Sequence, residues 1–405
     1  MGNTPQIYVA IPVMNECDLL KHCIDSIERQ TYKNFQVVIC INQPDEWWDN
    51  NEKRDVCLNN QKIGEFLKKN YNHYIVIDKS TKGNGWKGNK NGVGWARKTA
   101  MDYIASIASE EDIMLSLDAD TVFEKNYFNS IIELVKEYPI AVAISNPYYH
   151  RLTGKEAEDR AILRYEIYMR NYAINLLNIN SPYAFTALGS AMALPVKSYK
   201  AIGGMTPKLS GEDFYFLQKL RKYGNIIIYN TEKVFPEARF SDRVFFGTGP
   251  AMIKGNKGNW ESYPIYHHSF FKHISDTYSL FPSLFTEDIK TPLSDFLEEQ
   301  FNTPNIWELI RKNHKDKNRF VRACYEKLDG LRVLQYLKFA QDKINITDET
   351  CLLENSYIYK QYLGIPDAIF SNDLSFAKSP ITELDLIRNY LVKVEEIIQK
   401  EKKLI

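Results

Sequence analysis

The first 145 residues alternate short apolar runs with segments of helical periodicity, and this alternation restricts the folds open to the chain. Nearly continuous apolar runs of strand length are typical of strands buried on both faces of a parallel sheet. Strands separated by helices form βαβ units with right-handed crossovers. We therefore predict a doubly covered α/β sandwich with a mostly parallel sheet over residues 5–145. Its expected strands are Ile7–Val13, Phe35–Ile41, Tyr74–Ile77, Ile113–Leu117 and Ile140–Ile144.

Three helices are expected within this part of the chain. Apolar residues recur at helical spacing over Leu19–Ile27, and Asn15 stands where an N-cap is expected. Two more helices are predicted over Asn91–Ser109 and Lys125–Tyr138. The second ends at Tyr138 because Pro139 cannot continue a helix.

Beyond residue 145 the pattern becomes less regular, and from about residue 276 it is helical. We predict one domain over residues 1–275, with halves at 5–145 and 146–275, and a helical region over 276–405. The elements expected there are helices over Glu156–Leu177, Glu212–Tyr223, Phe320–Ala340 and Ile381–Ile398, a short helix ending at Gly203-Gly204, and strands over Ala187–Leu194 and Asn225–Tyr229.

Composition limits the partners and the compartment that we expect. The 51 Lys and Arg balance the 51 Asp and Glu, which argues against a nucleic-acid partner. The six cysteines form no Cys-x-x-Cys pair, so we expect reduced thiols in a cytoplasmic protein. We expect no leader peptide, and no transmembrane segment because no apolar run approaches about 20 residues. Lysines at 400, 402 and 403 leave open a peripheral lipid contact, or simply a solvated helix end.

The segment Asp118-Ala119-Asp120 directly follows the apolar run Ile113–Leu117. The carboxyl end of a parallel strand faces the crevice in which α/β sheets bind ligands. Carboxylates are hard oxygen ligands that suit Mg²⁺ or Mn²⁺. The alternative is a polar turn in which one aspartate caps the next helix.

A second acidic pair, Glu212-Asp213, opens a predicted helix after Ser210-Gly211. Asp213 in this position could act as a general base toward a hydroxyl group. The alternative is a capping box, with Ser210 bonded to the first turn and the acids stabilised by the helix dipole.

Two arginines four residues apart, Arg239 and Arg243, precede the flexible segment Gly247-Thr248-Gly249. Arginine binds diphosphate oxygens in a bidentate manner, although surface ion pairs in a solvated loop are an equal alternative. The run Gly83–Gly88 has the form Gly-x-Gly-x-x-Gly but follows the third strand, so we interpret it as a flexible loop that could place Lys87 or Lys90 near phosphate.

Taken in order, these segments resemble the family 2 glycosyltransferases over about residues 5–250. The resemblance rests on Val9–Glu16, Ser26–Tyr32, Asn91–Arg97, Asp118–Asp120, Gly203–Met205 and Gly211–Asp213. It implies a GT-A fold, that is, a Rossmann-like α/β/α sandwich, here with a helical C-terminal extension.

The resemblance also implies residue roles for the donor. The donor would be a nucleotide-diphosphate sugar, with a UDP-sugar favoured, and Mn²⁺ or Mg²⁺ would be the cofactor. The implied donor-binding residues are Pro12, Asn15, Glu16, Asp45, Arg97, Asp118, Ala119, Asp120 and Arg243. Glu16 or Asp45 would contact base or ribose, and Arg97 would lie near the nucleotide. Asp120 would hold the metal, with Asp118 beside it facing ribose or sugar as the second candidate ligand, and Arg243 would hold the leaving diphosphate.

For the acceptor side, the resemblance implies that Asp213, paired with Glu212, is the general base. The acceptor would be a saccharide or glycolipid hydroxyl, attacked in a single displacement that inverts the anomeric carbon.

The sequence departs from the family pattern in two places. Ile41–Pro44 replaces the usual aspartate after the second strand, and Phe235–Ala238 replaces a histidine, so His267 or His268 is considered as a further metal ligand. Three other classes remain as alternatives: an NAD(P)-dependent oxidoreductase built on Gly83–Gly88, a nucleotidyltransferase, and a non-catalytic nucleotide-sugar-binding scaffold.

Overall fold

The computed structural model describes residues 4–88, 90–208, 211–241, 247–364 and 369–405. The chain divides into two compact units. The first comprises Met1–Ile162, Phe185–Gly258 and Leu404, and the second comprises Leu163–Ala184, Asn259–Lys403 and Ile405. This division differs from the expected boundary at residue 275, because 163–184 and 259–275 pack with the later helices.

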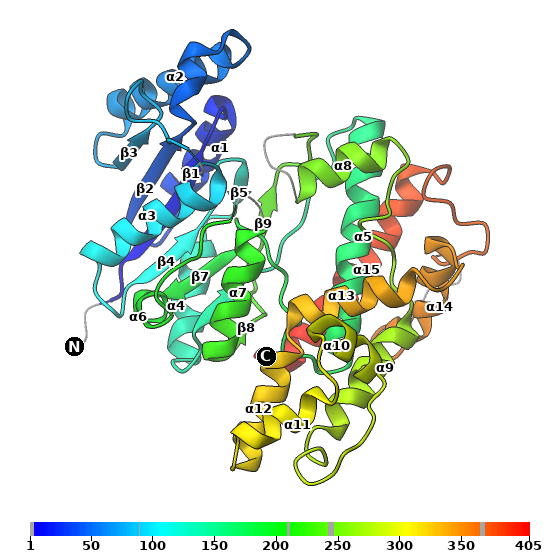
Figure 1. The fold of residues 1–405 in the computed structure, drawn as a ribbon. Coiled ribbons are helices and arrows are strands. Elements are labelled where there is room, and N and C mark those ends of the chain that lie inside the picture. Colours follow the sequence, from blue (N-terminus) through cyan, green and yellow to red (C-terminus); the bar gives the residue numbers. More distant parts are fainter. Residues whose placement is uncertain (1–3, 89, 209–210, 242–246, 365–368) are drawn as a thin grey trace. The chain divides into compact units, whose positions relative to one another are not determined.

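The first unit is built on a seven-stranded sheet with strand order β3-β2-β1-β4-β7-β6-β8 (Figure 1). β1, β2, β3 and β4 are parallel, and β7 runs antiparallel to its neighbours β4 and β6. The strands are β1 (Ile7–Val13), β2 (Phe35–Asn42), β3 (Ile75–Lys79), β4 (Ile113–Ser116), β6 (Ala143–Ser145), β7 (Met192–Pro195) and β8 (Ile226–Ile227). The predicted class, mixed α/β with a mostly parallel sheet and a helical C-terminal region, is confirmed.

The register of β1 explains where the site can form. Ile7 pairs with both Phe35 of β2 and Ile113 of β4, so β1 lies between these strands and all its residues are buried. Because the three strands run parallel, the segments that leave their carboxyl ends emerge at one edge of the sheet.

Helices and short elements of the first unit surround this sheet. α3 packs on β1 and β2, and α2 packs on β2 (Figure 1). β5 (Thr121–Phe123) pairs antiparallel with β9 (Val234–Pro236). The remaining elements are α1 (Cys17–Glu28), η1 (Asp45–Asp49), η2 (Asn51–Lys53), α2 (Arg54–Asn70), α3 (Val93–Ile107), α4 (Tyr127–Glu137), α6 (Val196–Ala201), α7 (Glu212–Tyr223) and α8 (Thr248–Asn256).

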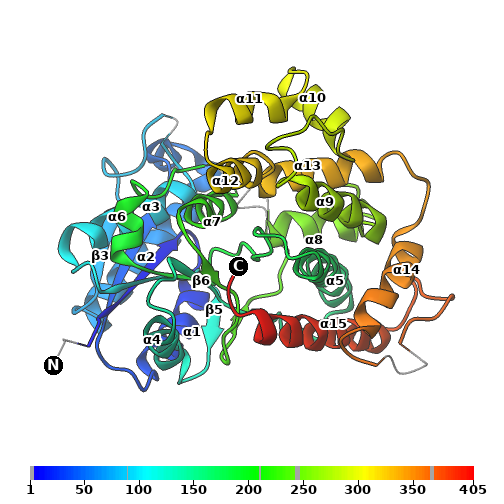
Figure 2. The same ribbon diagram turned by 90° about the horizontal axis from the view of Figure 1, so that it is seen from below.

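The described residues of the second unit form helices and no strand. α5 begins in the first unit and continues beside α15, to which buried ion pairs join it: Arg170 contacts Glu395 at 2.7 Å, and Arg388 contacts Glu166 at 3.2 Å (Figure 2). The helices are α5 (Glu156–Asn178), α9 (His268–Leu280), α10 (Ser294–Phe301), α11 (Ile306–Asn313), α12 (Lys317–Lys327), α13 (Gly330–Gln341), α14 (Asp348–Lys360) and α15 (Ile381–Lys402).

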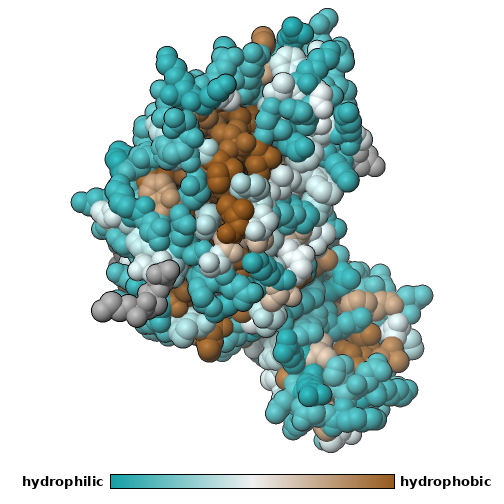
Figure 3. Space-filling model, turned by 90° about the vertical axis from the view of Figure 1, so that its left-hand side faces the viewer, coloured by the Kyte–Doolittle hydropathy of each residue, from teal (hydrophilic) through white to brown (hydrophobic). Residues whose placement is uncertain are grey.

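One face of the molecule shows apolar patches among mostly hydrophilic side chains. This face is the one seen from the left of Figure 1 (Figure 3). None of the helices in the described part of the chain has both the length and the apolar character needed to cross a bilayer.

The structure corrects three expectations about element boundaries. Asn15 is not an N-cap: it has φ 59° and its N–H donates to Asn60 Oδ1 at 2.8 Å, so α1 begins only at Cys17. The expected helix Phe320–Ala340 is two helices, α12 and α13. They separate because the Asp329 carboxylate caps the second by accepting from Arg332 N.

The third correction concerns the expected strand Ile140–Ile144. Pairing begins only at Ala143, because Ile140 is 77% exposed and lies outside the sheet. The predicted strand therefore began too early, because Ile140 is apolar but belongs to the turn that precedes the strand.

Candidate active site at the carboxyl edge of the sheet

The two aspartates of the Asp-x-Asp segment lie where β4 leaves the sheet. Leu117 N–H still donates to Ala10 of β1 at 3.1 Å, and Thr121 N–H then closes a turn onto the Asp118 carbonyl at 3.2 Å. Ala119 is fully buried within this turn, whereas both aspartate side chains are partly exposed. The expected position at the end of a central parallel strand is confirmed, and neither aspartate belongs to the first turn of a helix.

A buried arginine on α3 connects the strand end to the second acidic pair. The Arg97 side chain is 2% exposed, and it contacts Asp118 Oδ1 at 2.7 Å and Glu212 Oε1 at 3.2 Å. Its Nη1 also donates to Ser116 Oγ at 2.6 Å and to the Gly189 carbonyl at 3.0 Å. A buried guanidinium is stable only with such partners. Arg97 therefore holds two carboxylates from distant parts of the sequence in one place.

Gly189 permits this arrangement through its lack of a side chain. A Cβ atom at Gly189 would lie 2.3 Å from Nη2 of Arg97, which is closer than two such atoms can approach. The small residue before β7 is therefore required by the position of the guanidinium.

The acidic pair begins α7. Gly211 adopts φ +69°, and Glu212 is buried against Arg97. Asp213 accepts from Phe214 N at 2.8 Å. Burial, followed by the adjacent negative charge of Glu212, raises the pKa of Asp213 to about 7, while Arg97 opposes the shift. Ser210, the expected capping residue, lies outside the described residues.

A second arginine joins Asp120 to the turn after β1. Arg239 Nη2 contacts Asp120 Oδ2 at 3.0 Å and also forms an ion pair with the Glu16 carboxylate. The β9 strand brings this arginine to the site, because Glu237 N–H donates to the Asp120 carbonyl at 3.2 Å just before it. Its partner in the sequence motif, Arg243, lies outside the described residues.

The pKa of the buried Cys23 thiol responds to the negative charges of this edge. Its pKa is raised, mainly by burial and further by Asp120, Asp118 and Glu16, and its Sγ lies 3.7 Å from the Asp118 carbonyl. The thiol therefore stays protonated, and three carboxylates gather around one buried position. Arg239 is paired with Glu16 and Asp120, and Arg97 is paired with Asp118.

The chemistry of these donors fits Mg²⁺ or Mn²⁺. Asp118 and Asp120 offer carboxylate oxygens at a partly exposed edge, and Mg²⁺ keeps several waters and takes phosphate oxygens when few protein ligands are present. Within the described residues, the one group of three His, Cys, Asp or Glu side chains close enough to hold an ion lies elsewhere, at His267, His268 and Glu354 in the second unit.

The other residues expected to bind the donor lie on neighbouring segments. Pro12 is in β1 and pairs with Cys40 of β2. Asp45 accepts from Gly83 N at 2.7 Å and Gly85 N at 3.2 Å, so its carboxylate anchors the loop that follows β3. The roles of these residues toward base and ribose stay predictions.

The geometry of the glycine-rich segment does not favour the oxidoreductase alternative. Gly83–Gly88 follows β3 instead of β1, and α3 begins only at Val93. A dinucleotide-binding turn joins the first strand directly to its helix.

No protein-family model matches the chain, and no curated protein matches its sequence. Solved structures do match. S. aureus TarS 1–349 in complex with UDP-GlcNAc is 14% identical, with a TM-score of 0.40 over 91% of this chain and 98% of that one. The mannosyltransferase PcManGT from Pyrobaculum calidifontis, with GDP-Man and Mn²⁺, is 14% identical, with a TM-score of 0.36 over 97% and 86%. GalNAc-T7 with UDP, GalNAc and Mn²⁺ is 12% identical, with a TM-score of 0.39 over 76% and 56%.

One of these matched proteins is a mannosyltransferase, and all three TM-scores are below 0.5. Sequence analysis missed the contributions of Ser116 and Gly189, because no local pattern reveals a partner more than 70 residues away. Arg239 was visible as one of two spaced arginines, but its partners Glu16 and Asp120 were not.

Proposed function

We propose that the chain is a metal-dependent glycosyltransferase that moves a sugar from a nucleotide-diphosphate donor to an acceptor hydroxyl, with inversion, in polysaccharide or glycoconjugate synthesis. One observation carries this proposal: Arg97 ties Asp118, at the end of a central parallel strand, to the Glu212-Asp213 pair. A donor-side carboxylate and Glu212, the residue next to the candidate base Asp213, are thereby fixed on one buried cation.

The donor diphosphate would lie at the carboxyl edge of the sheet. Asp120 and Asp118 would hold Mn²⁺ or Mg²⁺, which when bound would neutralise the charge on the phosphate oxygens. Arg239 already spans Glu16 and Asp120 and would share these carboxylates with the cation. Arg243, four residues on, is proposed as a further contact to the leaving diphosphate.

The acceptor hydroxyl would lose its proton to Asp213. A base with a pKa close to neutrality combines a large ionised fraction with a strong tendency to take a proton. Burial, and then the like charge of Glu212, raise this pKa, and Arg97 holds Glu212 in place. Direct attack of the activated hydroxyl on the anomeric carbon, opposite the diphosphate, inverts that carbon.

We further propose a UDP-sugar as donor, a saccharide or glycolipid as acceptor, and the cytoplasm as the compartment, as the sequence resemblance and composition imply. Peripheral contact with a membrane that presents the acceptor is compatible with this proposal.

Donor turnover tests the proposed function. The full chain is incubated with UDP-, GDP- and CDP-sugars, with Mn²⁺ or with a chelator, and the released nucleoside diphosphate is measured over time. We expect metal-dependent release from one nucleotide class, reduced about 100-fold or more in Asp120→Asn. Glu111→Gln is the matched control, because it removes the same charge from an exposed side chain just before the opposite end of β4.

Binding of a nucleotide sugar without release from any candidate donor would favour the non-catalytic scaffold. Equal release from the wild-type chain and Asp120→Asn would contradict the proposed role of the Asp-x-Asp segment.

A further inference from the structure

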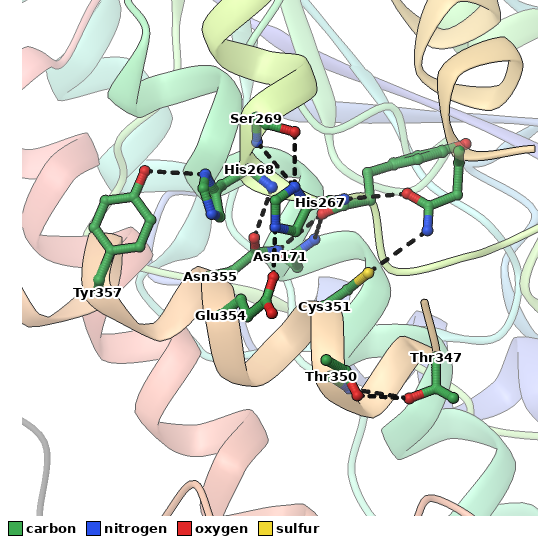
Figure 4. Close-up of polar contacts among 12 residues, drawn as sticks. Asn171, His267, His268, Ser269, Thr347, Thr350, Cys351, Glu354, Asn355 and Tyr357 are labelled. Carbon is green, nitrogen blue, oxygen red and sulfur yellow. Dashed lines mark hydrogen bonds and ion pairs between the residues drawn. The ribbon is translucent and has the colours of Figure 1, made fainter. Parts of the chain in front are cut away.

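Two adjacent histidines and a glutamate come together at the start of α9 (Figure 4). His267 is the N-cap residue of α9, His268 is its first residue, and Glu354 lies on α14. One nitrogen from each ring and one carboxylate oxygen all lie within 4.8 Å of one another. All three residues belong to the second unit, so the cluster is defined within one compact body.

His267 is held on both sides of its ring. Nε2 lies 2.6 Å from Glu354 Oε2, and Nδ1 lies 2.7 Å from Ser269 Oγ. Ser269 N–H also donates to Nδ1 at 3.3 Å, so in the metal-free state the ring proton sits on Nε2 and points at Glu354. His267 Nε2 and the Glu354 carboxylate thus already face one position, which the ring proton occupies.

His268 completes the cluster from the neighbouring position. Its ring centroid lies 4.0 Å from that of His267, and its Nδ1 lies 3.2 Å from the Tyr357 hydroxyl. Neutral imidazole is the form of histidine that coordinates a metal.

The backbone beneath the histidines is fixed by a second set of hydrogen bonds, drawn in Figure 4. His268 N–H donates to Asn355 Oδ1 at 2.8 Å, and Asn355 Nδ2 donates to Asn171 Oδ1, also at 2.8 Å. His267 N–H donates to Gln341 Oε1 at 3.2 Å. The ligand atoms are therefore carried by a rigid support drawn from α5, α13 and α14, which is how metal-binding side chains are positioned.

We propose that His267, His268 and Glu354 bind Zn²⁺, with water in the fourth position. Two imidazoles and one carboxylate with an open position are a zinc ligand set, and imidazole is a poorer ligand for Mg²⁺. Ligands of a tetrahedral Zn²⁺ lie about 3.4 Å apart, since each is about 2.1 Å from the metal. The Glu354 side chain is half-exposed, which leaves it room to rotate to this spacing.

Metal binding here requires a change of tautomer at His267. The Nε2 proton leaves to solvent and its lone pair becomes a metal ligand, while Nδ1 takes up a proton from solvent, so the ring stays neutral. Nδ1 then donates to Ser269 Oγ in place of accepting from Ser269 N–H, the usual arrangement for a zinc-bound histidine. The metal would join the start of α9 to α14 and stabilise the second unit.

A zinc titration of the full chain tests this site. The protein is stripped with a chelator, and Zn²⁺ affinity is measured by competition with a chromophoric chelator, together with the melting temperature. We expect one Zn²⁺ per chain, a higher melting temperature with zinc, and affinity at least about 10-fold weaker in Glu354→Gln and in His268→Gln. His273→Gln is the control: its ring is on the same helix and is bonded to the Tyr336 hydroxyl at 2.6 Å, outside the cluster.

Three results would overturn the proposal: no uptake of zinc by the wild-type chain, unchanged affinity in Glu354→Gln and His268→Gln, or loss of zinc binding in Asp120→Asn. If the cluster variants fail to fold, the visible absorption of Co²⁺ bound to the wild-type chain decides the question. A tetrahedral spectrum supports the site, and an octahedral spectrum contradicts it.

Discussion

Arg97 is the residue on which the site depends, and its burial defines its role. Sequence resemblance places it near the nucleotide, but the side chain is 2% exposed and bonds to Ser116, Gly189 and Asp118. We therefore interpret Arg97 as a positioning residue that orients Asp118 and Glu212. Because a buried charge without partners is costly, each of the three residues depends on the other two.

Replacing the candidate base tests the assignment of Asp213. Asp213→Asn removes the proton acceptor and keeps the size of the side chain, so we expect kcat to fall by about 10²–10⁴ with little change in donor affinity. Steady-state kinetics with saturating donor measures both values. Asp102→Asn, which removes a carboxylate bonded to Tyr199 on the far side of α3, is the control. Full activity in Asp213→Asn would rule out this base.

The raised pKa of Asp213 predicts a pH dependence of kcat. Asp213 accepts a proton only when ionised, so the rate should rise as pH rises through about 7 and level off above it. Since Glu212 contributes to raising this pKa, Glu212→Gln should move the rising limb to lower pH. A pH profile of single-turnover rates measures the shift. A limb that stays in place in Glu212→Gln would show that another group controls it.

At the scale of elements, the surroundings of Gly189 and Gly64 predict opposite effects on stability when each glycine is replaced by alanine. Gly189→Ala should destabilise the protein by about 1–3 kcal/mol, because the new Cβ displaces Arg97. Gly64→Ala lies within α2, where the new Cβ meets Ile41 Cδ1 at an ordinary 3.8 Å, and should stabilise it by about 0.5–1 kcal/mol. Urea unfolding measures both changes, and equal effects would contradict the packing described.

Strands were predictable where both faces are buried, and helices where the apolar stripe is regular. β1 matches its expected bounds because every residue of Ile7–Val13 is apolar and buried. α2 was missed because its inward face includes the polar Asn60, whose amide bonds to Gln43 and to the Asn15 N–H. β5 and β9 are too short to show alternation, and only their mutual pairing makes them strands.

The same contrast applies to the site. Asp118 and Asp120 were predictable because they end an apolar strand, which is a local feature. The connection of Asp118 to Glu212 through Arg97 depends on three segments that meet only in the folded sheet. The Glu16–Arg239–Asp120 arrangement likewise joins residues more than 100 positions apart, which no local pattern encodes.

At the scale of the whole molecule, the two units are interwoven in the sequence, because the second takes residues 163–184 from the middle of the first. A fragment of residues 1–275 would keep Glu166 and Arg170 but lose their buried partners Arg388 and Glu395. Breaking a buried ion pair costs about 3–5 kcal/mol, so we expect this fragment to be protease-sensitive or aggregated. Limited proteolysis and thermal melting compare it with the full chain. A fragment that melts cooperatively at the temperature of the full chain would contradict this expectation.

Calorimetric titration of the full chain with UDP, GDP and CDP sugars, in Mn²⁺ and in chelator, is the most direct test of the carboxyl edge as a metal-dependent donor site. We predict that one nucleotide class binds in Mn²⁺, that binding weakens at least about 10-fold in chelator and in Asp120→Asn, and that Glu111→Gln binds as the wild-type chain does. Undiminished binding in Asp120→Asn, or no binding of any nucleotide sugar in Mn²⁺, would contradict the account.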